Sequence, residues 1–202
     1  QLSYWKEHLK DLEPLNLPID FPRKAQQSFQ GDHYHFTIDP DTSKRIYDFS
    51  EKKGTTLFMT LLTSFKVLLS RYSNQTDICI GTPIANREQE EVDKLVGFFI
   101  NTLALRSNLD GNPKFNDLLK TIKENTLDAY AHKYAPFEQV VNQIVKTRDL
   151  SRSPLFQVMF VLQNKEENPE YKLGDVTLKS APYTYERSQF ELIFSISETS
   201  KG

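Results

Sequence analysis

Three polar segments interrupt apolar runs of this sequence, and their residue types could do chemistry. Asn86 and Arg87 directly follow the β-rich run DICIGTP (77–83), while Asn101 and Thr102 lie inside another apolar run, FFINTLALR (98–106). RDLSRSPL (148–155) places four further candidates just before a third β-rich run: Arg148, Asp149, Arg152 and Ser153. Polar groups in a core must find hydrogen-bond partners. Each segment could serve only as a turn, a cap or a sheet-end salt bridge, but together they predict the rim of a shared cleft or an interface between lobes.

The histidines and the cysteine add little further chemistry. His33 and His35 would point to the same side of a strand, but they lack suitable Cys, Asp or Glu companions, so we expect solvent-facing residues and no metal site. His132 ends an amphipathic helix, where the helix dipole stabilises a cation, and a functional role for it is equally open. Cys79 lies in an apolar run, and we expect it to be buried and inert.

Composition limits the possible partners. The chain has 202 residues and a net charge of -2, which suit one domain or a large lobe of a bigger one. Charges of both signs are interspersed, which gives no electrostatic reason to expect nucleic acid or an acidic membrane surface as a partner. Apolar stretches end well short of the roughly 20 residues that a membrane span needs. We therefore predict a soluble, cytoplasmic protein.

The hydrophobic pattern predicts a mixed α/β order. A short helix (2–11) leads into a proline-rich connector, and residues 33–38 alternate as a half-buried strand does. Helices are then expected from Asp39 to about Lys53, over 56–72, from 115 to 132 with Leu118, Leu119, Ile122 and Leu127 inward, and from Pro136. Strands are expected at 77–83, 98–106, 155–163, 173–178 and 190–197. This order predicts a two-layer α/β sandwich, a mixed sheet with helices packed on one face.

Seven segments of the chain form an ordered series of motifs. Four of them are GTPIANR (81–87), VGFFINTLALR (96–106), HKYAPFE (132–138) and RDLSRSPLFQVMF (148–160). The other three are YWKEHL (4–9), LPIDFPR (17–23) and TLFMTLL…LLSRYSNQTDICIGTP (56–83). In order and spacing, the first four resemble the core motifs of the condensation domains of non-ribosomal peptide synthetases, and the other three extend this resemblance over nearly the whole chain.

The resemblance implies a fold and an activity. Condensation domains resemble chloramphenicol acetyltransferase, with two similar α/β lobes in a V and a tunnel between them. Two peptidyl carrier proteins, donor and acceptor, deliver thioesters on phosphopantetheine arms, and the acceptor amine attacks the donor carbonyl to form an amide. No directly bound cofactor is implied, and an adjacent adenylation domain is an expected partner.

The family's HHxxxDG motif, which carries its catalytic histidine, does not occur in these residues. We therefore expect a lobe linker (1–32) and a C-terminal lobe (33–202) that is truncated at its end and inactive without the N-terminal lobe. The resemblance implies that Arg87 pairs with the aspartate of HHxxxDG, and that Asn101 and Thr102 lie near the tunnel. Arg148, Asp149 and Arg152 would form a structural network or line the acceptor side. The alternative is a non-catalytic lobe that docks carrier proteins or neighbouring domains.

Overall fold

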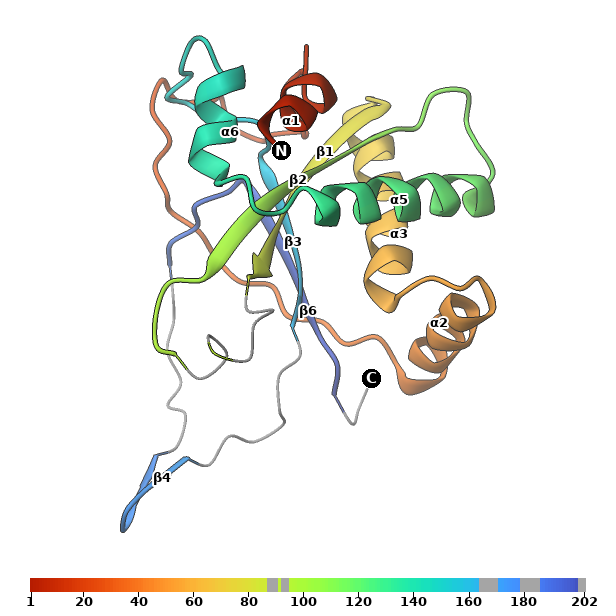
Figure 1. Cartoon of the computed structure of the whole chain (residues 1–202), viewed down its shortest axis with the longest axis vertical. Coiled ribbons are helices and arrows are strands. Elements are labelled where there is room, and N and C mark those ends of the chain that lie inside the picture. Colours follow the sequence, from red (N-terminus) through yellow and green to blue (C-terminus); the bar gives the residue numbers. More distant parts are fainter. Residues whose placement is uncertain (87–90, 92–94, 164–170, 179–185, 200–202) are drawn as a thin grey trace.

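The computed structural model describes residues 1–86, 91, 95–163, 171–178 and 186–199 (Figure 1). Its elements follow one another along the chain as α1 (Leu2–His8), α2 (Pro40–Lys52), α3 (Leu57–Ser73), β1 (Asp77–Ala85), β2 (Ile100–Asn108), α5 (Phe115–Ala131), α6 (Phe137–Ile144), β3 (Val158–Gln163), β4 (Tyr171–Leu173), β5 (Val176–Leu178) and β6 (Leu192–Ser197). Most of the expected helices and strands are therefore present.

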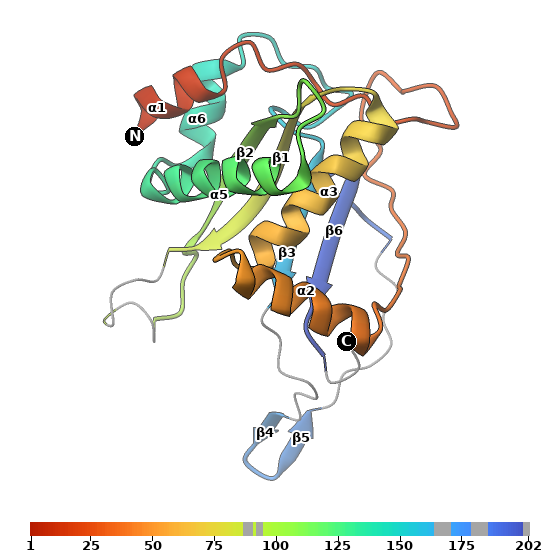
Figure 2. The same ribbon diagram turned by 90° about the vertical axis from the view of Figure 1, so that its right-hand side faces the viewer.

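The main sheet is mixed and has the strand order β2-β1-β3-β6. β1 and β2 form an antiparallel pair with Ile80 opposite Leu105, whereas β3 runs parallel to both β1 and β6. Helices α3 and α5 lie together over one face of this sheet, and β4 and β5 form a separate two-stranded hairpin (Figures 1 and 2). The expected α/β architecture, a mixed sheet with helices packed against it, is confirmed.

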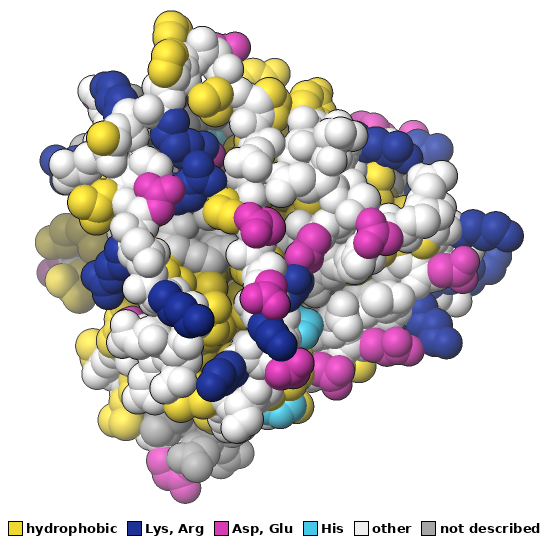
Figure 3. Space-filling view, turned by 90° about the horizontal axis from the view of Figure 1, so that it is seen from above, with side chains coloured by type: hydrophobic (Ala, Val, Ile, Leu, Met, Phe, Trp, Pro, Cys, Tyr) yellow, Lys and Arg dark blue, Asp and Glu magenta, His cyan; other side chains and the backbone are white. Residues whose placement is uncertain are grey.

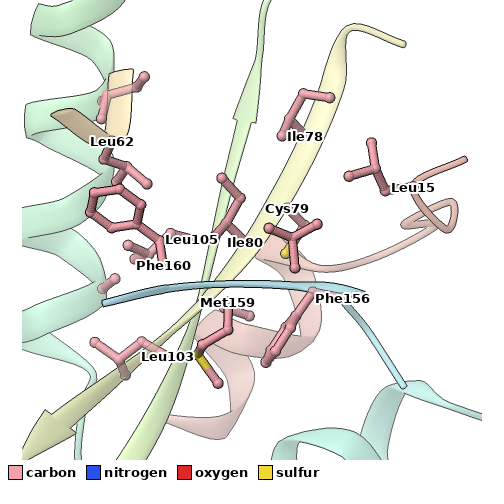
Figure 4. Close-up of a cluster of buried hydrophobic side chains, with 14 of the residues drawn as sticks. Leu15, Leu62, Ile78, Cys79, Ile80, Leu103, Leu105, Phe156, Met159 and Phe160 are labelled. Carbon is pink, nitrogen blue, oxygen red and sulfur yellow. The ribbon is translucent and has the colours of Figure 1, made fainter. Parts of the chain in front are cut away.

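The core lies between this sheet and the helices. Leu62 of α3 meets Ile80, Leu105 and Phe160 from three neighbouring strands, and none of these four side chains is more than 2% exposed (Figure 4). Phe65 extends the cluster toward β6, with ring centroids 5.6 Å from Phe160 and 4.5 Å from Phe194. Burial of these apolar side chains drives the helix layer against the sheet.

Local capping sets the helix ends near the sites that the sequence indicates. The Asp39 carboxylate accepts a hydrogen bond from Thr42 N–H (2.9 Å), and the Thr56 hydroxyl accepts one from Met59 N–H (3.2 Å). Gly54 follows α2 with φ +61°, and Asn74 ends α3 in the left-handed region. Gly and Asn adopt the left-handed conformation more readily than other residues, and a residue in this conformation ends a helix.

Three expectations about elements are wrong. Residues 33–38 form no strand, because no ladder pairs them in the described part of the chain. Leu127 is 49% exposed instead of inward, because Thr126 and Ala129 occupy the buried face of α5 after Ile122. Residues 173–178 are not one strand, since a turn at Gly174 divides them between β4 and β5.

Candidate functional site

Asn101 fastens β2 to the loop between α5 and α6. Its side-chain nitrogen donates to the carbonyl oxygens of Lys133 (2.7 Å) and Ala135 (2.8 Å), and its side-chain oxygen accepts from Phe137 N–H (3.1 Å). The last of these bonds satisfies an amide at the start of α6, where the helix itself supplies no partner. The side-chain amide of Asn101, which the sequence predicts to need hydrogen-bond partners, therefore has three of them. Through these bonds it holds the start of α6.

Asn86 lies at the same end of the β1–β2 hairpin as Asn101. Its backbone N–H donates to the carbonyl of Phe99 (3.1 Å), which continues the hairpin past the last paired residues, Ala85 and Ile100. The side-chain Oδ1 of Asn86 is buried and has no hydrogen-bond partner among the described atoms. Thr102 is half-buried within β2, opposite Pro83. Arg87 lies outside the described residues.

His132 caps α5 and joins it to α1. Its Nδ1 lies 2.8 Å from the carbonyl oxygen of Asp128, and its own carbonyl accepts a hydrogen bond from Trp5 Nε1 (3.0 Å). The imidazole stacks on the ring of Tyr4 with centroids 3.8 Å apart. Burial, with a smaller contribution from the Asp128 carboxylate, raises the pKa of Tyr4 to about 12. These contacts place His132 at the junction of α1 and α5.

The RDLSRSPL segment borders a groove of about 790 Å³ beside α6. Its lining combines apolar and charged side chains: Leu12, Phe29, Phe137, Val141, Ile144 and Leu155 are apolar, and Glu138, Lys146, Arg148, Asp149 and Arg152 are charged. Seen from above, Lys and Arg side chains gather on one part of this face, around a hollow that shows apolar side chains (Figure 3). The groove can therefore contact a ligand that has both apolar and polar parts.

The polar groups of the segment hold one another. Arg152 Nε forms an ion pair with the Asp149 carboxylate at 3.0 Å without the geometry of a hydrogen bond. Asp149 accepts hydrogen bonds from the hydroxyl (2.6 Å) and N–H (2.8 Å) of Ser151. These hydrogen bonds lower the pKa of Asp149. The Ser153 hydroxyl donates to the carbonyl of Gln189 (3.0 Å), and Arg148 lies exposed in the groove. The network therefore fixes the loop that enters β3.

The predicted site residues fall in two places. Asn86, Asn101 and Thr102 lie at the carboxyl end of β1, whereas residues 148–153 precede β3, which runs parallel to β1 and therefore begins at the opposite end. Helix α6 connects the two, because Asn101 holds its first residue and Phe137 also lines the groove.

Comparison with known proteins decides the family. The sequence profile of the Condensation domain matches residues 1–202. The chain belongs to the condensation-domain family. It is 40% identical over 203 residues to malpinin synthetase of Mortierella alpina, covering 100% of this chain and 3% of that protein. It is 40% identical over 197 residues to tyrocidine synthase 3 of Brevibacillus parabrevis, covering 97% of this chain and 3% of that protein. The condensation-domain chain thus spans a small part of these relatives.

Solved structures support the same fold. The X-domain from teicoplanin biosynthesis superimposes with a TM-score of 0.90 at 23% identity, over 98% of this chain and 44% of that one. A holo four-domain nonribosomal peptide synthetase bound to AMP and glycine gives a TM-score of 0.89 at 24% identity, over 99% of this chain and 16% of that one. The match therefore spans less than half of each of these structures.

The described residues of this condensation-domain chain were compared with the ligand sets that metal ions need. Within the described residues, no group of three or more His, Cys, Asp or Glu side chains could hold a metal ion. The rings of His33 and His35 do lie on one side of their segment, stacked with centroids 6.2 Å apart, but both side chains are exposed. The same described ranges hold no helix with the length and apolarity to cross a membrane.

Gln157 and Arg23 make polar contacts near the groove that the sequence did not predict. Gln157 is buried, and its amide joins the carbonyl of Ser153 (3.0 Å) to the backbone N–H of Leu15 (2.8 Å). Arg23 makes a bidentate ion pair with Glu191 at 2.7 and 3.1 Å. Gln157 could have been found from the sequence, because it is a polar residue in the apolar run LFQVMF. The pairing of Arg23 with Glu191 could not, because nothing in the sequence indicates that residues 168 positions apart are in contact.

Proposed function

We propose that this chain is the C-terminal lobe (33–202), with its connector (1–32), of a condensation domain that forms amide bonds in non-ribosomal peptide synthesis. The observation that carries the proposal is coverage: 98% of the chain superimposes on 44% of the teicoplanin X-domain with a TM-score of 0.90. Such a close match to under half of a relative is what one lobe of a two-lobed condensation domain is expected to give. Its residues also lack the HHxxxDG motif that the other lobe supplies.

The proposed reaction joins two thioesters carried on phosphopantetheine arms of donor and acceptor carrier proteins. The acceptor amine forms a bond to the donor carbonyl carbon, the carbon–sulfur bond breaks, and the amine proton ends on the departing thiol. This lobe contributes no catalytic histidine. Its contribution is to build one wall of the tunnel and to orient the reactants, because fixing two bound groups replaces a bimolecular encounter.

The two polar places found in the structure have separate roles in this proposal. Arg87 pairs with the aspartate of HHxxxDG across the lobe interface, and the unpartnered Oδ1 of Asn86 lies next to Arg87 in the sequence. Asn101 and Thr102 belong to the same end of the sheet and support the tunnel wall. The groove beside Arg148, Asp149 and Arg152 accepts the acceptor-side arm, whose chain has both apolar and polar groups.

A second candidate is a docking lobe without turnover. A solved complex of the X-domain and OxyB from teicoplanin biosynthesis superimposes on this chain with a TM-score of 0.86 at 24% identity. A condensation-like fold is therefore found in complex with another protein. In this second candidate, the groove beside α6 contacts a carrier protein or an adjacent adenylation domain.

Condensation assays distinguish the two candidates. The chain alone and the chain joined to its N-terminal lobe are mixed with donor and acceptor carrier proteins that carry aminoacyl thioesters, and the dipeptidyl product is measured by mass spectrometry. We expect product only from the joined protein, and at least a tenfold slower reaction from its Arg87→Ala variant than from the control Arg45→Ala on α2. Product from residues 1–202 alone contradicts the lobe assignment, and binding without product from the joined protein favours docking.

A further inference from the structure

Helix α1 docks on the rest of the chain through a few directional contacts. Arg106 of β2 holds its C-terminal end, because Nη1 donates to the carbonyls of His8 (2.9 Å) and Lys10 (2.8 Å). Trp5 holds its middle: the indole is buried and donates to the carbonyl of His132 (3.0 Å). Figures 1 and 2 show α1 lying beside α6. The position of α1 therefore depends on identifiable groups that can be changed one at a time.

Two imidazoles stack on the ring of Tyr4 within this docked helix. His8, one helical turn further along α1, has its ring centroid 5.2 Å from that of Tyr4, with the ring planes 9° apart. His132, which follows α5, lies closer, at 3.8 Å and 5°. Tyr4 thus contacts one histidine of its own helix and one of another element. Because stacked rings share a common plane direction, the three rings fix the orientation of α1 as well as its position.

The surroundings of His8 oppose a positive charge on its imidazole. Burial lowers the pKa of His8, and two cations, Arg106 of β2 and Lys66 of α3, lower it further. The carboxylates of Asp128 on α5 and Asp77 on β1 act in the opposite direction with smaller effects. Docked α1 therefore favours the neutral form of His8.

Protonation has a different consequence for His132. Its Nδ1 lies 2.8 Å from the carbonyl oxygen of Asp128, at the end of α5. A protonated imidazole carries a hydrogen on both ring nitrogens, so Nδ1 still donates to that carbonyl when His132 is charged. Of the two histidines that stack on Tyr4, His8 is therefore the one whose protonation works against the docking of α1.

We propose that the rings of His8, Tyr4 and His132 form a pH-sensitive clamp that holds α1 in place, and that protonation of His8 loosens this clamp. The inference rests on the proposed function in one respect, that α1 begins the connector (1–32) between two lobes. The direction of α1 then sets the direction of the N-terminal lobe. A loosened clamp lets the two lobes move apart, and amide formation slows because the reacting groups are no longer held together.

The pH range of the clamp follows from the difference between docked and undocked His8. Undocking exposes the imidazole, whose pKa returns to the ordinary histidine value of 6.5, whereas the pKa of the docked imidazole is lower. Between these two values the undocked helix binds a proton that the docked helix lacks, so docking weakens as the pH falls below 6.5. Each unit of difference in pKa weakens the docking equilibrium about tenfold.

Hydrogen exchange of the Trp5 indole N–H measures the docking of α1. Trp5 is the only tryptophan of the chain, so its indole gives a single NMR signal, and exchange requires the bond to the His132 carbonyl to open. We expect the protection factor to fall about tenfold from pH 7.5 to 5.5 in the parent chain. It should change little in His8→Phe, which keeps a ring beside Tyr4 but binds no proton. The backbone amide of Ile80 in β1 reports global unfolding, and equal pH dependence in parent and His8→Phe overturns the proposal.

Two further variants separate the clamp from general packing. His33→Gln changes an exposed histidine outside the clamp and should keep the pH dependence of the parent chain. Tyr4→Leu removes both ring contacts but keeps an apolar side chain, and it should lower the protection of Trp5 at pH 7.5 by roughly tenfold. Unchanged protection in Tyr4→Leu means that the stacked rings do not hold α1, which also overturns the proposal.

Small-angle X-ray scattering of the complete condensation domain tests the effect on the lobes. We expect its radius of gyration to increase from pH 7.5 to 5.5 in the parent domain and to increase less in His8→Phe. Stacking that only packs α1 locally would leave the spacing of the lobes unchanged. The same radius at both pH values in the parent domain therefore contradicts a role of the clamp in positioning the lobes.

These readouts separate the inference from the proposed function. Protection of Trp5 that depends on His8, without dipeptide synthesis by the complete domain at any pH, upholds the clamp and contradicts the catalytic assignment. Dipeptide synthesis by a domain in which the protection of Trp5 does not depend on His8 does the reverse.

Discussion

At the scale of single residues, the most unusual side chain is Lys66, which is 1% exposed within α3. Its ammonium group donates to the carbonyl of Leu105 (2.7 Å) and the hydroxyl of Ser107 (2.8 Å). Burial lowers the pKa of Lys66 to about 7, against smaller opposing effects of Cys79 and Asp77. Burial also raises the pKa of the Cys79 thiol to about 12, which fits the expected buried and inert cysteine.

The pKa of Lys66 predicts how stability depends on pH. Between pH 7 and the ordinary lysine value of 10.5, the unfolded chain binds a proton that the folded chain has lost, so the free energy of unfolding rises with pH. Below pH 7 Lys66 is protonated in both states, so the folded chain bears the full cost of burying its charge. This cost lowers the free energy of unfolding by a few kcal/mol, since each unit by which burial lowers the pKa corresponds to about 1.4 kcal/mol. Urea unfolding from pH 6 to 8.5 is expected to show this rise in the parent chain and a flatter profile in Lys66→Met. The exposed Lys120→Met on α5 serves as the control and should keep the parent slope.

At the scale of elements, short helices depend on neighbours for their position. α1 has 7 residues and α6 has 8, both below the length at which isolated helices are stable in water. α1 is anchored through Trp5 on the carbonyl of His132, and α6 through Phe137 on Asn101. Both anchors meet the loop after α5, so this loop sets the position of both helices and of one side of the groove.

Asn101 gives the sharpest element-scale prediction. Asn101→Ala removes three hydrogen bonds and is expected to lower the free energy of unfolding by about 1–3 kcal/mol. Asn101→Asp keeps an acceptor for Phe137 N–H but sets a carboxylate against two carbonyl oxygens, so it should be less stable than the alanine variant at pH 7. Protonation removes that repulsion, and the gap should narrow at pH 4.5. Chemical denaturation at both pH values measures the effect, with exposed Asn142→Ala on α6 as the control.

At the scale of the whole molecule, the sheet and the loop into β3 pack so closely that only glycine fits at one position of β1. A Cβ on Gly81 would lie 2.1 Å from the Phe156 ring. That ring cannot easily retreat, because it is 1% exposed and packs against Phe137 and Phe190 at centroid distances of 5.4 and 5.5 Å. The contact ties β1, α6 and the chain that leads into β6 into one core.

Gly81→Ala therefore tests the integrity of this core. We expect it to destabilise the chain by about 3 kcal/mol or more through overpacking. Gly111→Ala, at a turn with φ +76° and no atom within 4 Å, should cost less, about 1 kcal/mol, because only backbone strain is involved. Trimming the ring in Gly81→Ala/Phe156→Leu should restore part of the loss, which a double-mutant cycle in urea measures. Additive losses in the double variant would argue against the close approach.

The helices, most of the strands and the family could be predicted from the sequence, because they depend on local signals. Asp39 and Thr56 cap helices through neighbours three residues away, and periodicity identifies most of the buried face of α5. The ordered motifs likewise needed no structure to indicate the Condensation family that the profile confirms.

Which distant residues lie together could be seen only in the folded chain. The selected polar residues divide between two ends of parallel strands. Gln157 and Arg23 contact the second group at the carbonyls of Ser153 and Ser151, and they also bind Leu15 and Glu191, which lie 142 and 168 positions away from them along the chain. Residues 33–38 have a strand's pattern but no paired ladder, since a strand requires a neighbouring backbone as well as a suitable sequence. Contacts between distant residues and the pairing of strands depend on long-range packing and hydrogen bonding, and hydrophobic periodicity does not predict them.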